Sequence, residues 1–422
     1  MSTKPKVRVR EPLRDGREFV VKIGEDSLPP DHPARLLWIA LGHFDLRGFV
    51  EDARSVEAHA GRDVYSPRMM LTLWGYALHR GIVHARKIER AILTDADFRW
   101  ITGDMTVKHT RLSSFLVDHR EAMLDLLSDV LGALMDAGLL FLPSQRLCQD
   151  GTKVAANAGR GSFHDEEGLR RCREQARLHL TAVMARMDDP PPTEREQLAS
   201  ERAAAAMVDR VEQALARLPE EKARKLESHD KSRQTQAARV STTDPEARVM
   251  KVGAYGPTVP AYNLQLATVG DPHGGAVTVV GVRVDTTGND RGSVWGMREQ
   301  IACTAGLMPI QVVVDSDHVG LEDVRRASRE SLDLISTVPS HWRATSAKQD
   351  ATTRAWMARM ESSEAHEIYR GRKALSERPN AIVKTMYGLR QLPVRGQARI
   401  ECLTLLMAIM IDLYEHQNLW LN

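Results

Sequence analysis

The chain has 422 residues, which is too long for one small module and indicates two or three domains. It carries 58 Lys and Arg against 56 Asp and Glu, a formal net charge of +2, with 42% hydrophobic and 27% charged residues. This composition is that of an ordinary globular protein and excludes global disorder. The near-zero net charge leaves nucleic-acid binding open, because the placement of the basic residues decides it.

No apolar run is long enough to cross a bilayer, and the basic N-terminus lacks the apolar segment of a secretory signal. The four cysteines lie far apart without a CxxC pair, which disfavours a disulfide framework and a cysteine zinc site. We therefore expect a protein of the reducing cytoplasm, associated with the nucleoid if it binds DNA. The basic segment 4–17 is either an arm on DNA or a solubilising tail.

The first third of the chain has the periodicity of helices. Segment 31–33 and the pair Ser66-Pro67 are typical helix starts, with a capping residue followed by proline in the first turn. Apolar residues from Met123 to Leu134 recur at helical spacing, and Gly138 stands where a helix would end. The pattern predicts an all-helical domain over residues 31–140, after a basic arm over residues 1–30.

Valine-rich runs bounded by Gly, Pro and Asp predict strands in the second half. They lie at 261–268, 276–284, 310–314 and 332–337, and an earlier strand is expected to end at Asp150-Gly151-Thr152. The polar stretch 168–241 predicts a helical hairpin that turns at the proline-rich segment 188–192. The apolar run 397–414 predicts a buried helix. Segments 141–167 and 242–422 are thus expected to form one α/β domain around the hairpin.

Three acids stand at the ends of such segments. Asp150 and Asp315 each follow an apolar strand, and Glu377 follows Ser376, a plausible helix cap, with Pro379 in the first turn. Acids that meet at one sheet edge raise one another's pKa, and divalent cations remove that cost. Two Mg²⁺ ions about 4 Å apart stabilise the attacking and leaving oxygens of a phosphoryl displacement. Spacing alone does not select these three among 56 acids.

Several blocks of sequence, taken together, select these three acids. The first is Asp150-Gly151-Thr152-Lys153-Val154-Ala155-Ala156-Asn157-Ala158. Others lie at 65–68, 74–76, 88–90, 98–101, 109–115, 244–248, 261–265 and 314–315, followed by Glu377, Lys384, Gly388, Arg390 and Arg395-Gly396. In this order and spacing the blocks resemble bacterial insertion-sequence transposases of the Asp-Asp-Glu type that have an InsH-like N-terminal domain.

The resemblance implies an RNase H-like catalytic core, a mixed sheet with flanking helices, that cuts and rejoins transposon-end DNA. It implies that Asp150, Asp315 and Glu377 are catalytic and hold two Mg²⁺ ions, with Mn²⁺ as an alternative. The DNA-binding residues it implies are Tyr369, Arg372, Lys373, Lys384, Arg390 and Arg395. The partners are duplex DNA at the transposon ends and target DNA, and a homodimer is expected because two ends have to be held.

The sequence departs from the family pattern at several positions. Ser316-Asp317-His318 replaces Ala-Gly-Tyr, which makes Asp317 a candidate additional ligand. Lys373 replaces an arginine, so the charge is kept but the two-pronged contact with phosphate is lost. A catalytically inactive DNA-binding relic is therefore the alternative function. A metal-dependent nuclease without preference for transposon ends is a third.

Overall fold

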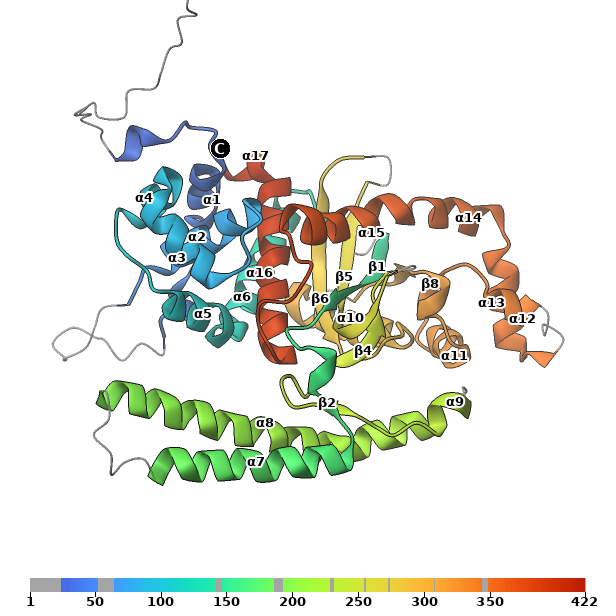
Figure 1. Cartoon of the computed structure of the whole chain (residues 1–422). Coiled ribbons are helices and arrows are strands. Elements are labelled where there is room, and N and C mark those ends of the chain that lie inside the picture. The colour runs from blue at the N-terminus through green and yellow to red at the C-terminus, as the bar shows by residue number, and fades with distance from the viewer. Residues whose placement is uncertain are drawn as a thin grey trace, which may run out of the picture.

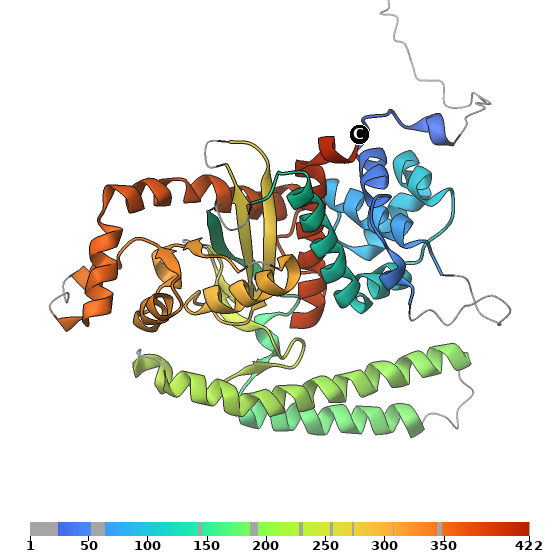
Figure 2. The same ribbon diagram turned by 180° about the vertical axis from the view of Figure 1, so that it is seen from behind.

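The computed structural model describes residues 24–51, 64–141, 146–185, 193–227, 231–253, 256–271, 274–306, 308–343 and 348–421. Most of the predicted basic arm and the predicted turn at 188–192 lie outside these residues. Figures 1 and 2 show a group of N-terminal helices beside an α/β core, with a long helical hairpin alongside.

Helices precede the first strand, as predicted. They are α1 (Pro33–Leu41), α2 (Pro67–His79), α3 (Ala85–Thr94), α4 (Ala96–Thr102), α5 (His109–Asp118) and α6 (Arg120–Asp136). The hydroxyl of Ser66 caps α2 by accepting from the backbone N–H of Met69 at 3.4 Å. His32 caps α1. The apolar faces of these helices belong to one hydrophobic core that continues into the α/β part.

A mixed sheet forms the centre of the α/β core. Its strands are β1 (Leu147–Ala155), β4 (Arg248–Lys251), β5 (Thr258–Gly270), β6 (Val277–Asp285), β7 (Gln311–Val313) and β8 (Asp333–Ile335). The strand order is β4-β5-β1-β7-β8, with β6 also paired to β5. β1 runs antiparallel to β5 and parallel to β7, which is parallel to β8. This sheet with flanking helices is consistent with an RNase H-like core, so the predicted fold class is confirmed.

Asp150 lies inside its strand and does not end it. β1 continues through Gly151 to Ala155 because every residue from Cys148 to Ala155 pairs with β5. The predicted strand exit at this point is therefore wrong. The Asp-Gly pair has the local composition of a turn, but pairing with a distant strand keeps it extended.

Further helices follow β6 along the chain, and several of them cover the sheet. They are α10 (Ser293–Ala305), α11 (Leu321–Arg329), α12 (Ser340–Arg343), α13 (Ala351–Met360), α14 (Ser363–Arg370), α15 (Arg372–Ala381), α16 (Gln397–Glu415) and α17 (Gln417–Trp420). α15 crosses β1 and β5 (Figure 1), and α10 lies on the side of the sheet seen from behind in Figure 2. None of the helices in the described part of the chain is long and apolar enough to span a membrane.

α16 joins the N-terminal helices to the sheet. It is the buried helix predicted over 397–414, and it packs against α5 and α6 as well as β6. The carboxylate of Asp412 accepts from the backbone N–H of Val279 at 2.7 Å, and that of Glu415 accepts from Val277 at 3.2 Å. These side chains satisfy backbone donors of β6 at an edge where no described strand pairs with it.

The predicted helical hairpin is formed by α7 (Glu166–Ala185) and α8 (Glu194–Leu226), with the short α9 (Lys231–Gln234) after it. The antiparallel strands β2 (Phe163–His164) and β3 (Val240–Ser241) close its base. A small hydrophobic core of its own lies there, which includes Leu169 and Leu218. The hairpin is thus inserted between β1 and β4, and Figure 1 shows it below the sheet.

Glu377 does not stand at a helix start. α15 begins at Arg372, so Ser376 is buried inside the helix and the predicted cap is wrong. Pro379 also lies inside α15 and lacks the N–H that would donate to the carbonyl of Leu375. The hydroxyl of Thr268 on β5 donates to that carbonyl at 3.0 Å instead. The sheet therefore supplies the donor that allows α15 to continue past its proline.

We expect Thr268→Val to lower the free energy of unfolding by about 1–3 kcal/mol, because the buried carbonyl of Leu375 is left without a donor. Urea unfolding of the full chain measures the loss. In a Pro379→Ala background the helix has its own donor for this carbonyl, so the same substitution should cost less.

Thr404→Val is the matched control. Its buried hydroxyl donates to the carbonyl of Ile400 at 2.8 Å, which already accepts within α16. A loss at Thr268 that is no larger than the loss at Thr404, or that is unchanged by Pro379→Ala, would contradict this account of α15.

Candidate active site

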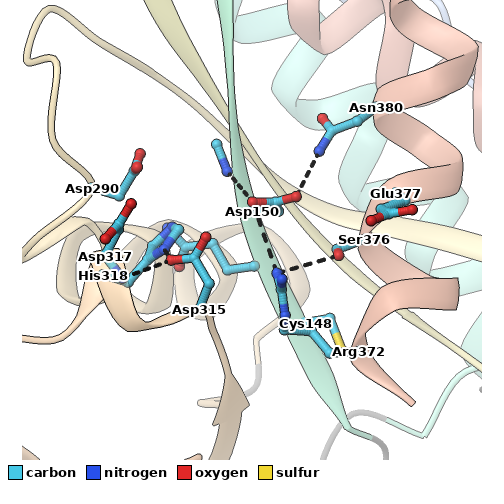
Figure 3. Close-up of polar contacts among 12 residues, drawn as sticks. Cys148, Asp150, Asp290, Asp315, Asp317, His318, Arg372, Ser376, Glu377 and Asn380 are labelled. Atoms are coloured by element: carbon cyan, nitrogen blue, oxygen red, sulfur yellow. Dashed lines mark hydrogen bonds and ion pairs between the residues drawn. The ribbon is translucent and has the colours of Figure 1, made fainter. Parts of the chain in front are cut away.

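Asp150 and Asp315 come together because of strand register. β1 and β7 are parallel neighbours in which Cys148 pairs with Val313. Two residues further along each chain stand Asp150 and Asp315, so the two acids lie next to each other (Figure 3). Burial raises the pKa of Asp150, and the negative charge of Asp315 raises it further.

The carboxylate of Asp150 is largely enclosed, with its side chain 20% exposed. It accepts from the backbone N–H of Gly151 at 3.0 Å and from the amide of Asn380 on α15 at 3.2 Å. The guanidinium of Arg372 lies 3.9 Å away. Burial is the main cause that raises the pKa of Asp150, and Arg372 opposes it. This carboxylate is thus held on one side by α15 and left beside a like charge on the other.

Asp315 is held by the turn that follows it, η5 (Ser316–His318). One carboxylate oxygen accepts from the backbone N–H of Asp317 at 3.0 Å and lies 2.7 Å from Nδ1 of His318, a fully buried side chain. Burial raises the pKa of Asp315, but the hydrogen bond and charge of His318 outweigh it, so the pKa is lowered on balance. Asp315 therefore has a stable charge, in contrast to Asp150.

A buried polar network supports this histidine. Nε2 of His318 lies 3.2 Å from Oε1 of Gln265, which also accepts from the amide of Gln149 at 3.0 Å. The amide of Gln265 in turn donates to Asp290. A Cβ added at Gly151 would come within 2.5 Å of the Asp290 carboxylate. Glycine follows Asp150 because a side chain there would enter this network.

Glu377 is close to the pair but turned away from it. Its side chain is 60% exposed and lies 4.0 Å from the ammonium of Lys373, one turn earlier on α15. Asn380, almost one turn later on α15, donates a hydrogen bond to Asp150 (Figure 3). Within the described residues, no three His, Cys, Asp or Glu side chains lie close enough to hold a metal ion as they stand. The structure therefore brings two of the three predicted acids together and leaves the third outside.

The donor chemistry fits magnesium at the first two acids. Asp150 and Asp315 offer carboxylate oxygens, the ligands this ion prefers, and a cation between them removes their repulsion. Glu377 and Asn380 are three residues apart, so their Cβ atoms lie about 5–6 Å from each other on one face of α15. Glu377 thus stands on the same face of α15 as a side chain that contacts Asp150.

Four of the six predicted DNA-binding residues lie at or beside the three predicted acids. Arg372 faces Asp150 and lies over the ring of Tyr369, with its guanidinium carbon 5.6 Å from the ring centre. Lys384 is half-buried in the π-helical segment η7 (Ile382–Met386) that extends α15. Burial lowers the pKa of Lys384, and the charge of Asp150 opposes this. Lys373, the fourth member of this group, is exposed beside Glu377.

The remaining two lie further away. Arg390 and Arg395 are exposed on the segment that leads from η7 to α16. Arg395 donates to the backbone carbonyl of Asn157 at 2.9 Å, beyond the end of β1, and lines a cleft of about 560 Å³ with Ser113 and Ser114 of α5. Asp317, the candidate additional ligand, is exposed.

The sequence reasoning did not identify Gln265, His318 and Asn380 as parts of the site. His318 stands three residues after Asp315, in the tripeptide that departs from the family pattern. This departure was the feature of the sequence that could have indicated its role. Gln265 lies opposite Gly151 in the sheet, a position that only the register of β1 and β5 reveals.

Residues 23–118 match a family model described as a transposase domain (DUF772). The match covers the N-terminal helices from α1 to α5 and ends before α6. This confirms the resemblance to transposases with an InsH-like N-terminal domain. A search of curated proteins finds no match, and a search of solved structures finds none either.

The opposite pKa shifts of the two acids predict opposite effects on stability without divalent cations. The raised pKa of Asp150 means that its charge destabilises the fold, a penalty that develops as the pH rises above the unfolded value of about 3.9. The lowered pKa of Asp315 means that its charge stabilises the fold, and this is lost as the pH falls through the folded value.

At pH 7 in EDTA, Asp150→Asn should therefore raise the free energy of unfolding, and Asp315→Asn should lower it by roughly 1–3 kcal/mol. Urea unfolding measures both. Asp317→Asn, at an exposed position, is the control and should stay within about 0.5 kcal/mol of the wild type. Shifts of the same sign for Asp150 and Asp315 would show that the electrostatics are misassigned.

Proposed function

We propose that the chain is a DNA transposase that cleaves and joins transposon-end DNA by phosphoryl transfer, with Asp150, Asp315 and Glu377 as its catalytic acids. The observation that carries this proposal is the register of β1 and β7, which pairs two acids from distant segments in a chain with a transposase domain. Acids paired in this way are costly unless a cation joins them.

Asp150 and Asp315 would hold Mg²⁺, and Glu377 would complete the ligand set after leaving Lys373. When bound, two such ions neutralise charge on the phosphoryl oxygens and make water a stronger nucleophile. Mn²⁺ prefers similar oxygen ligands and would serve in its place.

The basic residues of α14, α15 and η7 would position the DNA. Arg372 is fixed between Tyr369 and Asp150, so its guanidinium is already placed for a non-bridging phosphate oxygen. Lys384, on the helical turns that follow, would contact a phosphate of the same DNA strand. A phosphate that binds Lys373 would compete with Glu377 and release this carboxylate toward the pair. DNA binding would thus help to complete the acidic site.

The protein residues around the acids would hold them in place during the reaction. Asn380 orients Asp150 through its amide, and His318 orients Asp315. Arg390 and Arg395 would extend the contact along the DNA toward the helical domain, which is expected to bind the transposon end. Since a transposition event has two ends and needs a site for each, a homodimer on DNA is part of the proposal.

One observation favours an alternative. Glu377 is exposed and paired with Lys373, and the Ser316-Asp317-His318 sequence departs from the family pattern. A chain whose third acid never joined the pair would bind DNA without cutting it. It would be a catalytically inactive relic of a transposase.

In the full chain with end-containing duplex DNA and Mg²⁺, we expect Asp150→Asn, Asp315→Asn and Glu377→Gln each to lower nicking by about a thousand-fold or more. Such a factor corresponds to about 4 kcal/mol of lost transition-state stabilisation. DNA binding, measured by fluorescence anisotropy, should be retained in all three. Glu364→Gln, which changes an exposed carboxylate on α14, is the control and should nick as the wild type does.

The wild-type reaction separates the candidate functions. Joining of the cut end to target DNA supports the transposase, and binding without nicking supports the relic. Nicking without preference for the transposon end indicates a nuclease. Full cleavage by the Glu377→Gln variant would remove this residue from the site.

A further inference from the structure

A groove of about 1020 Å³ lies between the helical hairpin and the sheet. Its walls come from the last part of β1, the turn η3 (Arg160–Ser162), α8, the segment around β3, β4, and the loop before α10. Figure 1 shows α8 running past β4 and β2 along this side of the core. The groove therefore exists because the hairpin is inserted between β1 and β4.

Basic side chains dominate the lining. They are Lys153, Arg160, Arg217, Arg224, Lys225, Arg239, Arg248 and Lys251, against the carboxylates of Glu220 and Glu221. Arg248 pairs with Glu220 at 2.6 Å and with Glu221 at 3.2 Å. Glu221 also pairs with Arg224, and Glu246 beside the groove pairs with Arg217. These three carboxylates thus form ion pairs with three of the arginines.

The other cations have no acidic partner in the described part of the chain. No ion pair joins Lys153, Arg160, Arg239 or Lys251 to a described carboxylate. Lys225 donates to the backbone carbonyl of Ala237 at 2.8 Å. Burial lowers the pKa of Lys225, and the nearby charges of Arg224 and Arg239 lower it further. The negative charge of Glu221 opposes this shift. The groove thus has an excess of positive charge.

The groove lies further along β1 than the candidate active site. Lys153 is three residues beyond Asp150, about 10 Å along the strand, and its side chain is on the opposite face because successive side chains alternate. On the other side, Asn289 lines the groove and precedes Asp290, whose carboxylate accepts from Gln265 in the network behind Asp315. DNA that follows β1 from the acids and passes from one face of the strand to the other would reach the groove about 10 Å further on.

The cations come from separate parts of the chain, which bears on what they bind. Lys153 lies on β1, Arg160 in η3, Arg239 before β3 and Lys251 at the end of β4. Charges distributed along a groove of this size match an extended polyanion better than a single small anion. Duplex DNA presents one charge per about 1.7 Å of its axis.

We propose that this groove binds the phosphate backbone of duplex DNA that continues from the strand held at the catalytic acids. The phosphate-binding residues are Lys153, Arg160, Arg239 and Lys251. The hairpin is then one wall of a DNA channel. This inference rests on the proposed function, because it takes the DNA at Asp150 as its starting point.

The test is the salt dependence of DNA binding. The full chain is titrated onto end-containing duplex DNA, without divalent cations, over a series of KCl concentrations. The variant combines Arg160→Gln, Arg239→Gln and Lys251→Gln, three exposed positions whose loss should leave thermal unfolding unchanged. Each lost phosphate contact reduces the slope of log K against log salt by about 0.9, so the slope should fall by about 2.7.

The matched control removes three exposed arginines from the same hairpin outside the groove lining, by Arg170→Gln, Arg171→Gln and Arg177→Gln. Its slope should equal that of the wild type. Equal slopes for the groove variant and the wild type overturn the proposal. A changed oligomeric state in light scattering with an unchanged slope also overturns it, and assigns the groove to a protein interface.

Nicking by the same proteins separates this proposal from the proposed function. If the wild type nicks transposon ends and the slopes are equal, the groove assignment fails and the function stands. If the slope falls as expected and the wild type never nicks, the groove stands as a DNA site and the catalytic proposal fails. A wild-type chain that binds no DNA overturns both.

Discussion

The pairing of β1 with β5 on one side and with β7 on the other determines where the acids of the candidate site lie. The parallel register with β7 places Asp150 and Asp315 at the same level of the sheet. The antiparallel register with β5 places Gln265 opposite Gly151 and Thr268 opposite Cys148.

Through these two side chains β5 also reaches the other parts of the site. Gln265 contacts His318, which holds Asp315, and Thr268 donates to the carbonyl that Pro379 leaves open in α15. α15 carries Glu377 and the basic residues next to it. A shift of β5 by one residue would turn both side chains to the opposite face of the sheet. The pairings of β1 with its two neighbours thus determine the positions of Asp150 and Asp315, and that of the helix that carries Glu377.

In the free protein each acid of the candidate site has a basic side chain beside it. Arg372 and Lys384 face Asp150, His318 faces Asp315, and Lys373 lies beside Glu377. Under the proposed function, DNA phosphates would compete for three of these cations, and a divalent cation would compete for the carboxylates. On this account the site is assembled fully only when DNA and metal are both bound, which restricts strand cleavage to the assembled complex.

The sequence was sufficient where local patterns decide the structure, and insufficient where distant pairing decides it. Helical spacing and the Ser66 cap predicted α2 and its neighbours, and the valine-rich runs predicted β5 to β8. The Asp150-Gly151 pair has the composition of a turn, but β5 keeps it extended. Ser376 and Pro379 have the pattern of a helix start, but the donor that tolerates the proline inside α15 is Thr268, 107 residues away from Leu375.

In the candidate site, too, some features could be predicted from the sequence and others depend on contacts between distant segments. The spacing of motif blocks identified Asp150, Asp315 and Glu377 among 56 acids, and the transposase domain at 23–118 agrees with the family they indicate. The outward rotamer of Glu377 depends on Lys373 and could not be read from the sequence. The basic groove could not be predicted either, since its cations come from segments that only the inserted hairpin brings together.

The central claim is that Asp150 and Asp315 form a metal site that Glu377 joins when DNA is bound. Anomalous X-ray diffraction from crystals of the full chain with transposon-end DNA and Mn²⁺ tests it most directly. The account predicts an anomalous peak between Asp150 and Asp315, with a carboxylate oxygen of Glu377 within about 2.2 Å of a metal ion, close to the distance for Mg²⁺. No peak at these acids, or a Glu377 that still lies beside Lys373 with metal and DNA bound, would contradict it.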